Sequence, residues 1–168
     1  LGHTHATIGV MVNNTLKIDL ADANETANLA GILAQNVQIG DTILLTGAVG
    51  AGKTHFARSF IKSLLTVDED VPSPTFTLVQ TYDTTAGEVW HSDLYRLNAE
   101  QEIEELGLFD AMTEAVCLIE WPDRLGSYAP TDALHIELTP SSILDSRVLI
   151  AQWNDPKWDT KTKEWRSD

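Results

Sequence analysis

The distribution of apolar residues along the chain predicts several short strands. The runs "TILLTG" at 42–47 and "AVCLIEWP" at 115–122 are continuous enough for buried strands. The segment "ALHIEL" alternates apolar and polar residues, and "RVLIAQW" supplies one more strand. "TFTLVQTY" and "EVWHSD" are joined by the turn-rich "DTTAG", which predicts a β-hairpin. Strand material broken at Asn13 and Asn14 also precedes the first helical segment.

Helical spacing recurs between these strands. In "DANETANLAGILAQNVQIG", Asp22 lies three residues before Glu25, which is typical of a capping box and predicts a helix that stops by Gly40. The segment "THFARSFIKSLL" is amphipathic, and "NAEQEIEELGLFDAM" predicts a helix that starts at Asn98. The tail "NDPKWDTKTKEWRSD" shows no periodic spacing of apolar residues, so we expect it to fray.

A glycine-rich loop connects the first buried strand to the amphipathic helix. "GAVGAGKT" matches G-x-x-x-x-G-K-[ST], with Gly47, Gly52, Lys53 and Thr54 at the fixed positions and Gly50 as an extra glycine. Glycine backbones can take left-handed angles and turn their N–H groups around a phosphate, and the helix N-terminus adds unpaired N–H groups. In this motif the lysine reaches the β and γ phosphates and the hydroxyl ligates Mg²⁺. The sequence therefore predicts a nucleotide site, the alternative being a loop that fits by chance.

The fold class follows from the order of these elements. Strands that alternate with helices around such a loop predict an α/β architecture, here a three-layer P-loop NTPase-like fold whose sheet the hairpin makes mixed. With 168 residues, of which 43% are hydrophobic, the chain is long enough for one domain and too short for two. We expect a single domain over 1–168 with flexible ends. His3 and His5 near the start are typical of a mobile tail rather than of a metal site.

The charge balance narrows the possible partners. Eleven Lys and Arg against 25 Asp and Glu give a formal charge of -14, which repels nucleic acid beyond the roughly 8 Å that physiological salt leaves unscreened. The same charge opposes a nucleotide, so attraction must come locally from Lys53, backbone dipoles and a metal ion. No apolar run is long enough to cross a bilayer, and we expect a cytoplasmic protein without membrane contact. The single cysteine, Cys117, is expected to be a buried small hydrophobe.

Two acidic residues end predicted strands. Glu120 follows the apolar run 116–119, where a P-loop enzyme places an acid that holds Mg²⁺ or orients the attacking water, and Asp93 ends "VWHSD". Ligands of open α/β sheets bind beyond the carboxyl ends of the strands, so both acids are candidates for a metal or water role. The alternative is that strands often end in acidic residues because they emerge into water.

The neighbours of these acids have less certain roles. Trp121 could pack on a nucleotide, but a core or lid position is the simpler interpretation. His91 is interpreted as a structural strand histidine. His55 could add positive charge beside the phosphates or face solvent, and Thr75 and Thr77 could sense a γ-phosphate or be ordinary strand residues.

Together the motifs resemble those of a known family. "GAVGAGKT", "SPTFTLV", "HSDLYRL" and "LIEWPDRLG" occur in this order in the TsaE (YjeE) proteins, small bacterial P-loop ATPases that act in making threonylcarbamoyl-adenosine in tRNA. The similarity spans about residues 20–150. It implies ATP as substrate, Mg²⁺ as cofactor, and ATP hydrolysis coupled to a TsaB-TsaD complex that modifies the adenosine next to the anticodon. Contact with tRNA would then be indirect, which fits the negative charge.

The resemblance also implies a set of site residues. Lys53, Asp93 and Glu120 would be catalytic, and Thr54, Glu120 and Asp93 would hold the metal ion. The nucleotide would be bound by the whole loop together with flanking residues: Gly47, Ala48, Val49, Gly50, Ala51, Gly52, Lys53, Thr54, Thr26, Trp121 and Arg147. The family commonly has Asp at Ala48 and Thr or Ser at His55.

Two rival functions remain open at this point. A small P-loop kinase would usually bring several arginines over the phosphates, whereas this chain has five scattered arginines. A non-hydrolysing switch would need Lys53 but no catalytic acid, and nucleotide occupancy alone would order the region of Thr75 for a partner.

Overall fold

The computed structural model describes residues 14–166, so His3, His5 and the strand material before Asn14 lie outside the described residues. The chain begins with β1 (Asn14–Leu20), α1 (Ala23–Ala34), β2 (Thr42–Thr46) and α2 (Lys53–Leu64). The hairpin and two short helices follow: β3 (Val79–Thr84), β4 (Gly87–Asp93), α3 (Glu102–Glu105) and α4 (Leu108–Glu114). The remaining elements are β5 (Val116–Glu120), η1 (Pro122–Tyr128), β6 (Leu134–Pro140), β7 (Arg147–Trp153), α5 (Lys157–Lys161) and η2 (Lys163–Trp165).

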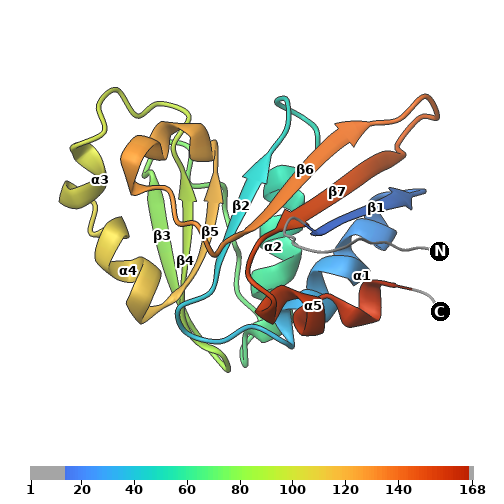
Figure 1. The fold of residues 1–168 in the computed structure, drawn as a ribbon, viewed down its shortest axis with the longest axis horizontal. Helices are drawn as coiled ribbons and strands as arrows, with labels where there is room; N and C mark the ends of the chain where they lie inside the picture. The colour runs from blue at the N-terminus through green and yellow to red at the C-terminus, as the bar shows by residue number, and fades with distance from the viewer. Residues whose placement is uncertain (1–13, 167–168) are drawn as a thin grey trace.

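The strands form one mixed sheet in the order β1-β7-β6-β2-β5-β4-β3 (Figure 1). The central strands are parallel, because β2 pairs with both β5 and β6, and β4 pairs with β5. The outer pairs are antiparallel: β1 with β7, β6 with β7, and β3 with β4. The predicted mixed sheet and hairpin are therefore confirmed.

Helices cover both faces of the sheet. Side chains of β5 alternate between two hydrophobic cores, with Val116 and Leu118 in one and Cys117 and Ile119 in the other. The first core packs against α1, α2 and the C-terminal helices, and the second packs against α3, α4 and η1. The expected three-layer α/β fold is confirmed. Within residues 14–166, none of the helices combines the length and the apolar character needed to cross a membrane.

The two helices nearest the glycine loop form as predicted. The Asp22 carboxylate accepts a hydrogen bond from the Glu25 backbone N–H at 3.0 Å, and the Glu25 carboxylate accepts one from Ala21 N–H at 2.8 Å. Helix α1 ends at Ala34, earlier than the expected stop at Gly40. In α2 the apolar side chains at helical spacing are all buried: Phe56, Phe60, Ile61 and Leu64.

Three local predictions are wrong. The helix expected from Asn98 is instead two short helices, because Gly107 takes a left-handed φ of 78° between α3 and α4. The strand expected from Thr75 starts only at β3, because residues 74–78 form a turn closed by Leu78 N–H donating to Pro74 O at 2.7 Å. The described part of the tail, up to Arg166, is ordered by α5 and η2, and Trp158 is fully buried.

Candidate functional site

A cleft of about 890 Å³ opens where the glycine loop meets the carboxyl ends of β4 and β5. Most of the predicted site residues line it: Thr26, Val49, Gly50, Gly52, Lys53, Thr54, Asp93, Glu120, Trp121 and Arg147. Gly47, Ala48 and Ala51 belong to the loop but do not line the cleft. Sequence reasoning missed several other residues of its wall, namely Asp22, Ala23, Asn24, Tyr95 and Asp145. The cleft therefore brings together residues that are far apart in the sequence.

The path of the loop depends on its glycines. Gly47, Gly50 and Gly52 have positive φ angles of 144°, 84° and 109°. A Cβ on Gly47 would lie 2.4 Å from the backbone oxygen of Leu138 in β6, a separation that real Cβ atoms do not show. The first hydrogen bond of α2 runs from Phe56 N–H to Gly52 O, so the three amides before it have no acceptor within the helix. Free amides at a helix N-terminus are suited to bind an anion.

Lys53 is folded over the loop. Its Nζ donates to the backbone oxygens of Gly47 at 2.6 Å and Ala48 at 3.1 Å. The residue is only 5% exposed, and burial lowers the pKa of Lys53, whereas the negative charges of Glu120 and Asp93 act in the opposite direction. The ammonium thus lies at the centre of the loop beside both candidate acids.

Thr54 joins the loop to the end of β5. Its hydroxyl lies 3.0 Å from Glu120 Oε1 and 3.1 Å from Oε2, and donates to this carboxylate. Glu120 is 2% exposed and is the register partner of Asp93, which is 5% exposed. The two strand-end acids are therefore buried neighbours beneath the loop, and they do not emerge into water as the structural alternative assumed.

Asp93 connects this centre to the turn before β3. Its Oδ2 accepts from the Thr75 hydroxyl at 3.1 Å, and its Oδ1 accepts from Tyr95 N–H at 3.0 Å. Arg96 donates to the backbone oxygens of Thr75 at 2.9 Å and Phe76 at 2.6 Å. The turn that contains Thr75 is thus held through Thr75 and Phe76 by Asp93 and the nearby Arg96.

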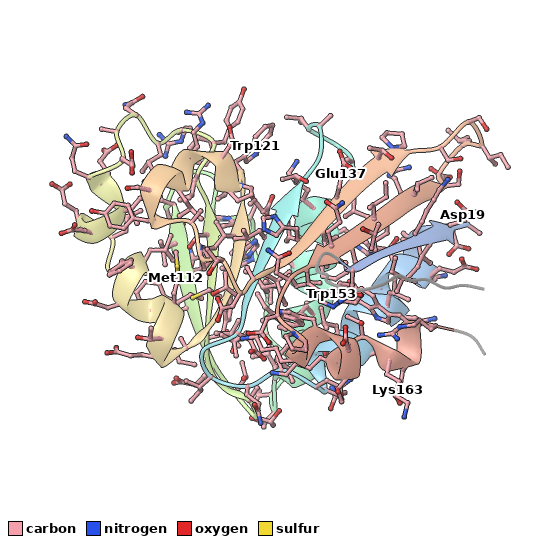
Figure 2. The ribbon with its side chains drawn as sticks, viewed as in Figure 1. Asp19, Met112, Trp121, Glu137, Trp153 and Lys163 are labelled. Carbon is pink, nitrogen blue, oxygen red and sulfur yellow. The ribbon has the colours of Figure 1, made fainter. Side chains whose placement is uncertain are left out.

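Two side chains flank the loop. Trp121 has φ 61° and ψ 54°, a left-handed conformation that is uncommon for a large residue and is found most often at functional sites. Its ring centroid lies 4.6 Å from Lys53 Nζ, and Figure 2 shows the side chain at the end of the sheet where β5 leads into η1. On the other side, Arg147 donates to the backbone oxygens of Ala51 at 3.0 Å and Gly50 at 3.3 Å.

Both histidines near the loop make defined contacts. His55 lines the cleft, and its Nε2 lies 2.9 Å from the backbone oxygen of Ala23, so it links the first turns of α2 and α1. His91 is fully buried, and its Nε2 lies 2.7 Å from Glu120 Oε2. Sequence reasoning assigned His91 only a structural role, and its place two residues before Asp93 on the same face of β4 was the available signal.

The donor set fits Mg²⁺ better than a softer metal. Thr54, Glu120 and Asp93 offer only oxygen atoms, and Mg²⁺ is usually bound through one or two carboxylates together with substrate phosphates. Residues 14–166 contain no cluster of three or more His, Cys, Asp or Glu side chains that would hold a metal by itself.

The single cysteine, Cys117, is buried as predicted, and burial raises the pKa of its thiol to about 12.

Comparison with known proteins gives a consistent result. The sequence model of the family described as Threonylcarbamoyl adenosine biosynthesis protein TsaE matches residues 20–148. The chain is 44% identical to the tRNA threonylcarbamoyladenosine biosynthesis protein TsaE of Rickettsia felis over 62% of its own length and 61% of that relative. It therefore spans about three fifths of that protein.

Other relatives are covered more fully. The chain is 39% identical to the protein of the same name from Rickettsia bellii, over 71% of this chain and 83% of the relative. The fold is also similar to the crystal structure of Bacillus subtilis YdiB, with a TM-score of 0.74 and 25% identity over 92% of this chain and 96% of that one. This chain belongs to the TsaE family of threonylcarbamoyl adenosine biosynthesis proteins.

Proposed function

We propose that this chain binds ATP with Mg²⁺ and hydrolyses it as the ATPase of tRNA threonylcarbamoyladenosine synthesis. The observation that carries the proposal is the hydrogen bond between Thr54 of the glycine loop and the buried Glu120. In P-loop enzymes the metal bridges the phosphates and neutralises developing charge. Lys53 would pair with the phosphates, Thr54 and Glu120 would hold the metal, and Asp93 would be the second acid.

The residues that line the cleft favour the binding of a nucleoside beside the phosphates. Thr26 is buried in the first helical turn of α1, and Asp22 and Asn24 lie next to it in the lining. Arg147 and Trp121 flank the loop on its two sides. The cleft volume of about 890 Å³ lies within the usual range of small-molecule sites, which is roughly 300–1,000 Å³.

The arginines argue against the kinase alternative. Of the five arginines, only Arg147 lines the cleft. The other four donate to backbone oxygens of other segments: Arg58 to Val71, Arg96 to Thr75 and Phe76, Arg124 to Leu97, and Arg166 to Asp159. A small P-loop kinase would usually bring several cationic side chains over the phosphates to stabilise charge on the transferred phosphoryl group. The switch alternative is separated from an ATPase by the catalytic role of Glu120, because a switch does not need Glu120 for catalysis.

Exposed apolar side chains around the cleft support the binding of a protein partner, and we propose that this partner is a TsaB-TsaD complex. Val49 and Phe76 are 79% and 84% exposed, and Tyr95 is 48% exposed. Exposed large apolar residues that gather at one place on a surface are typical of protein interfaces. Because the net charge of -14 disfavours direct binding of tRNA, the chain would reach the tRNA through such partners.

The pathway is tested by measuring threonylcarbamoyladenosine in tRNA. A bacterial strain depleted of its own TsaE is supplied with this chain, with Lys53→Ala, or with Lys163→Ala, which changes an exposed lysine far along the sequence from the loop. We expect the modified nucleoside to be restored by the wild-type chain and by Lys163→Ala, but not by Lys53→Ala. Equal restoration by all three, or by none, would contradict the proposed function.

A further inference from the structure

None of the roles assigned so far explains the buried contact between His91 and Glu120. His91 is 0% exposed and Glu120 is 2% exposed, and 2.7 Å separates His91 Nε2 from Glu120 Oε2. Within residues 14–166, the other ring nitrogen of His91, Nδ1, has no hydrogen-bond partner. Burying a polar group without a partner is costly. The bond to Glu120 is therefore the polar contact that the buried imidazole makes.

The sheet explains how the imidazole reaches the acid. In the parallel β4–β5 pair, His91 is opposite Leu118 and Asp93 is opposite Glu120, so His91 and Asp93 lie on one face of β4. The histidine thus approaches Glu120 from within the sheet. Thr54 approaches the same carboxylate from α2 and contacts both of its oxygens. The Glu120 carboxylate is fixed between a strand and a helix.

We propose that His91 is a positioning residue for Glu120. We assign the hydrogen to His91 Nε2, which then donates to the Glu120 Oε2 atom that lies 2.7 Å away. This bond sets the rotation of the carboxylate and orients it toward the Thr54 hydroxyl and the cleft. The role rests on the proposed ATPase function, since His91 acts only through Glu120 and does not line the cleft. Outer partners of this kind commonly orient the groups that hold a metal ion.

Matched variants separate positioning from packing. His91→Leu removes the donor, and His91→Gln keeps an N–H donor at a similar reach. Ser92→Ala is the control, because Ser92 is the next residue of β4, is equally buried, and has a hydroxyl without a partner among the described residues. Single-turnover ATP hydrolysis with the TsaB-TsaD complex and equilibrium binding of ATP are measured for each variant.

We expect His91→Leu to lower turnover by about 10–100-fold while the affinity for ATP is retained. His91→Gln should recover most of this loss, and Ser92→Ala should match the wild type. In a Glu120→Ala background, His91→Leu should cause no additional loss, because groups that act as a unit are not additive. Full turnover in His91→Leu, or an additional loss in the double variant, would overturn the proposal.

A second readout does not depend on activity. Nitrogen-15 NMR of the His91 imidazole in the nucleotide-free chain should show a hydrogen on Nε2, and the Nε2 signal should shift in Glu120→Ala. An Nε2 without a hydrogen would contradict the positioning role alone. Absence of hydrolysis by the wild-type chain with its partners would overturn the ATPase function and the role that rests on it, and the NMR result would still identify the contact.

Discussion

The Thr54 hydroxyl and the Glu120 carboxylate lie within hydrogen-bond distance of each other, at 3.0 and 3.1 Å for the two carboxylate oxygens. One residue belongs to the first turn of α2, and the other ends β5. The parallel pairing of β2 with β5 explains the contact, because the loop after β2 and the acid at the end of β5 emerge at the same edge of the sheet. This hydrogen bond joins the glycine loop to the acid at the end of β5.

The first prediction concerns the metal dependence of nucleotide binding. Thr54→Ala removes the hydroxyl that we propose as a metal ligand, so the affinity for ATP in the presence of Mg²⁺ should fall about tenfold or more, which corresponds to about 1.4 kcal/mol. Thr54→Ser keeps the hydroxyl and should bind like the wild type. Calorimetric titrations with Mg²⁺ and with a chelator provide the measurement. An equal loss under both conditions would show that Thr54 acts independently of a metal ion.

A second prediction concerns the backbone of the loop. Gly47→Ala would place a Cβ 2.4 Å from Leu138 O at a φ of 144°, so we expect it to lower the free energy of unfolding by at least about 2 kcal/mol. Gly50→Ala is the matched control, because a Cβ there meets nothing within 4 Å at a φ of 84° and should cost only about 1–2 kcal/mol. Urea denaturation measures both. If the two variants are equally stable, the close approach to β6 is not what restricts Gly47.

The third prediction tests the C-terminal helix. Trp158 is fully buried, and its Nε1 donates to Asp132 O at 2.8 Å. Trp158→Ala should lower the free energy of unfolding by about 3–5 kcal/mol because it leaves a large cavity. Trp158→Phe keeps most of the apolar volume and should cost less. Denaturation midpoints that stay at the wild-type value in both variants would mean that α5 does not contribute to the core.

The fourth prediction concerns how pH affects the reactivity of the Cys117 thiol and the stability of the chain. Burial raises the pKa of its thiol from 9.0 to about 12, so at pH 8 only on the order of one molecule in ten thousand carries the reactive thiolate. The folded chain should resist alkylation at pH 8, and the chain in denaturant should react fully. Because the folded pKa is the higher one, this group should also reduce stability as pH rises from 9 toward 12. Rapid labelling of the folded chain at pH 8 would contradict the burial.

The sequence predicted the centre of the fold well, because its signals are local. A glycine loop between an apolar run and an amphipathic segment specifies strand, turn and helix together, and the structure forms all three. The acids Asp93 and Glu120 end their strands, and the topology brings them together as register partners. Two contacts at the site depend on the sheet topology and could not be predicted from the spacing of residues: Thr75 contacts Asp93, and His91 contacts Glu120.

The error in the C-terminal tail arose because distant contacts decide its local structure. The C-terminal tail has no periodic spacing of apolar residues, but Lys157 and Lys161 both pair with the buried Asp41, which directly precedes β2. Trp165 donates from Nε1 to Leu29 O in α1 at 3.0 Å. These partners lie more than a hundred residues away in the chain, so a short window of sequence contains no sign of them.

The central claim is that the loop with Lys53 and Thr54 forms an ATPase centre together with Glu120. Its most direct test is steady-state phosphate release from ATP by the wild-type chain and by Glu120→Ala, each with and without the TsaB-TsaD complex. We predict slow release by the wild-type chain alone, a rise with the complex, and a collapse in Glu120→Ala while nucleotide binding survives. Phosphate release that neither the substitution nor the complex changes would contradict the claim.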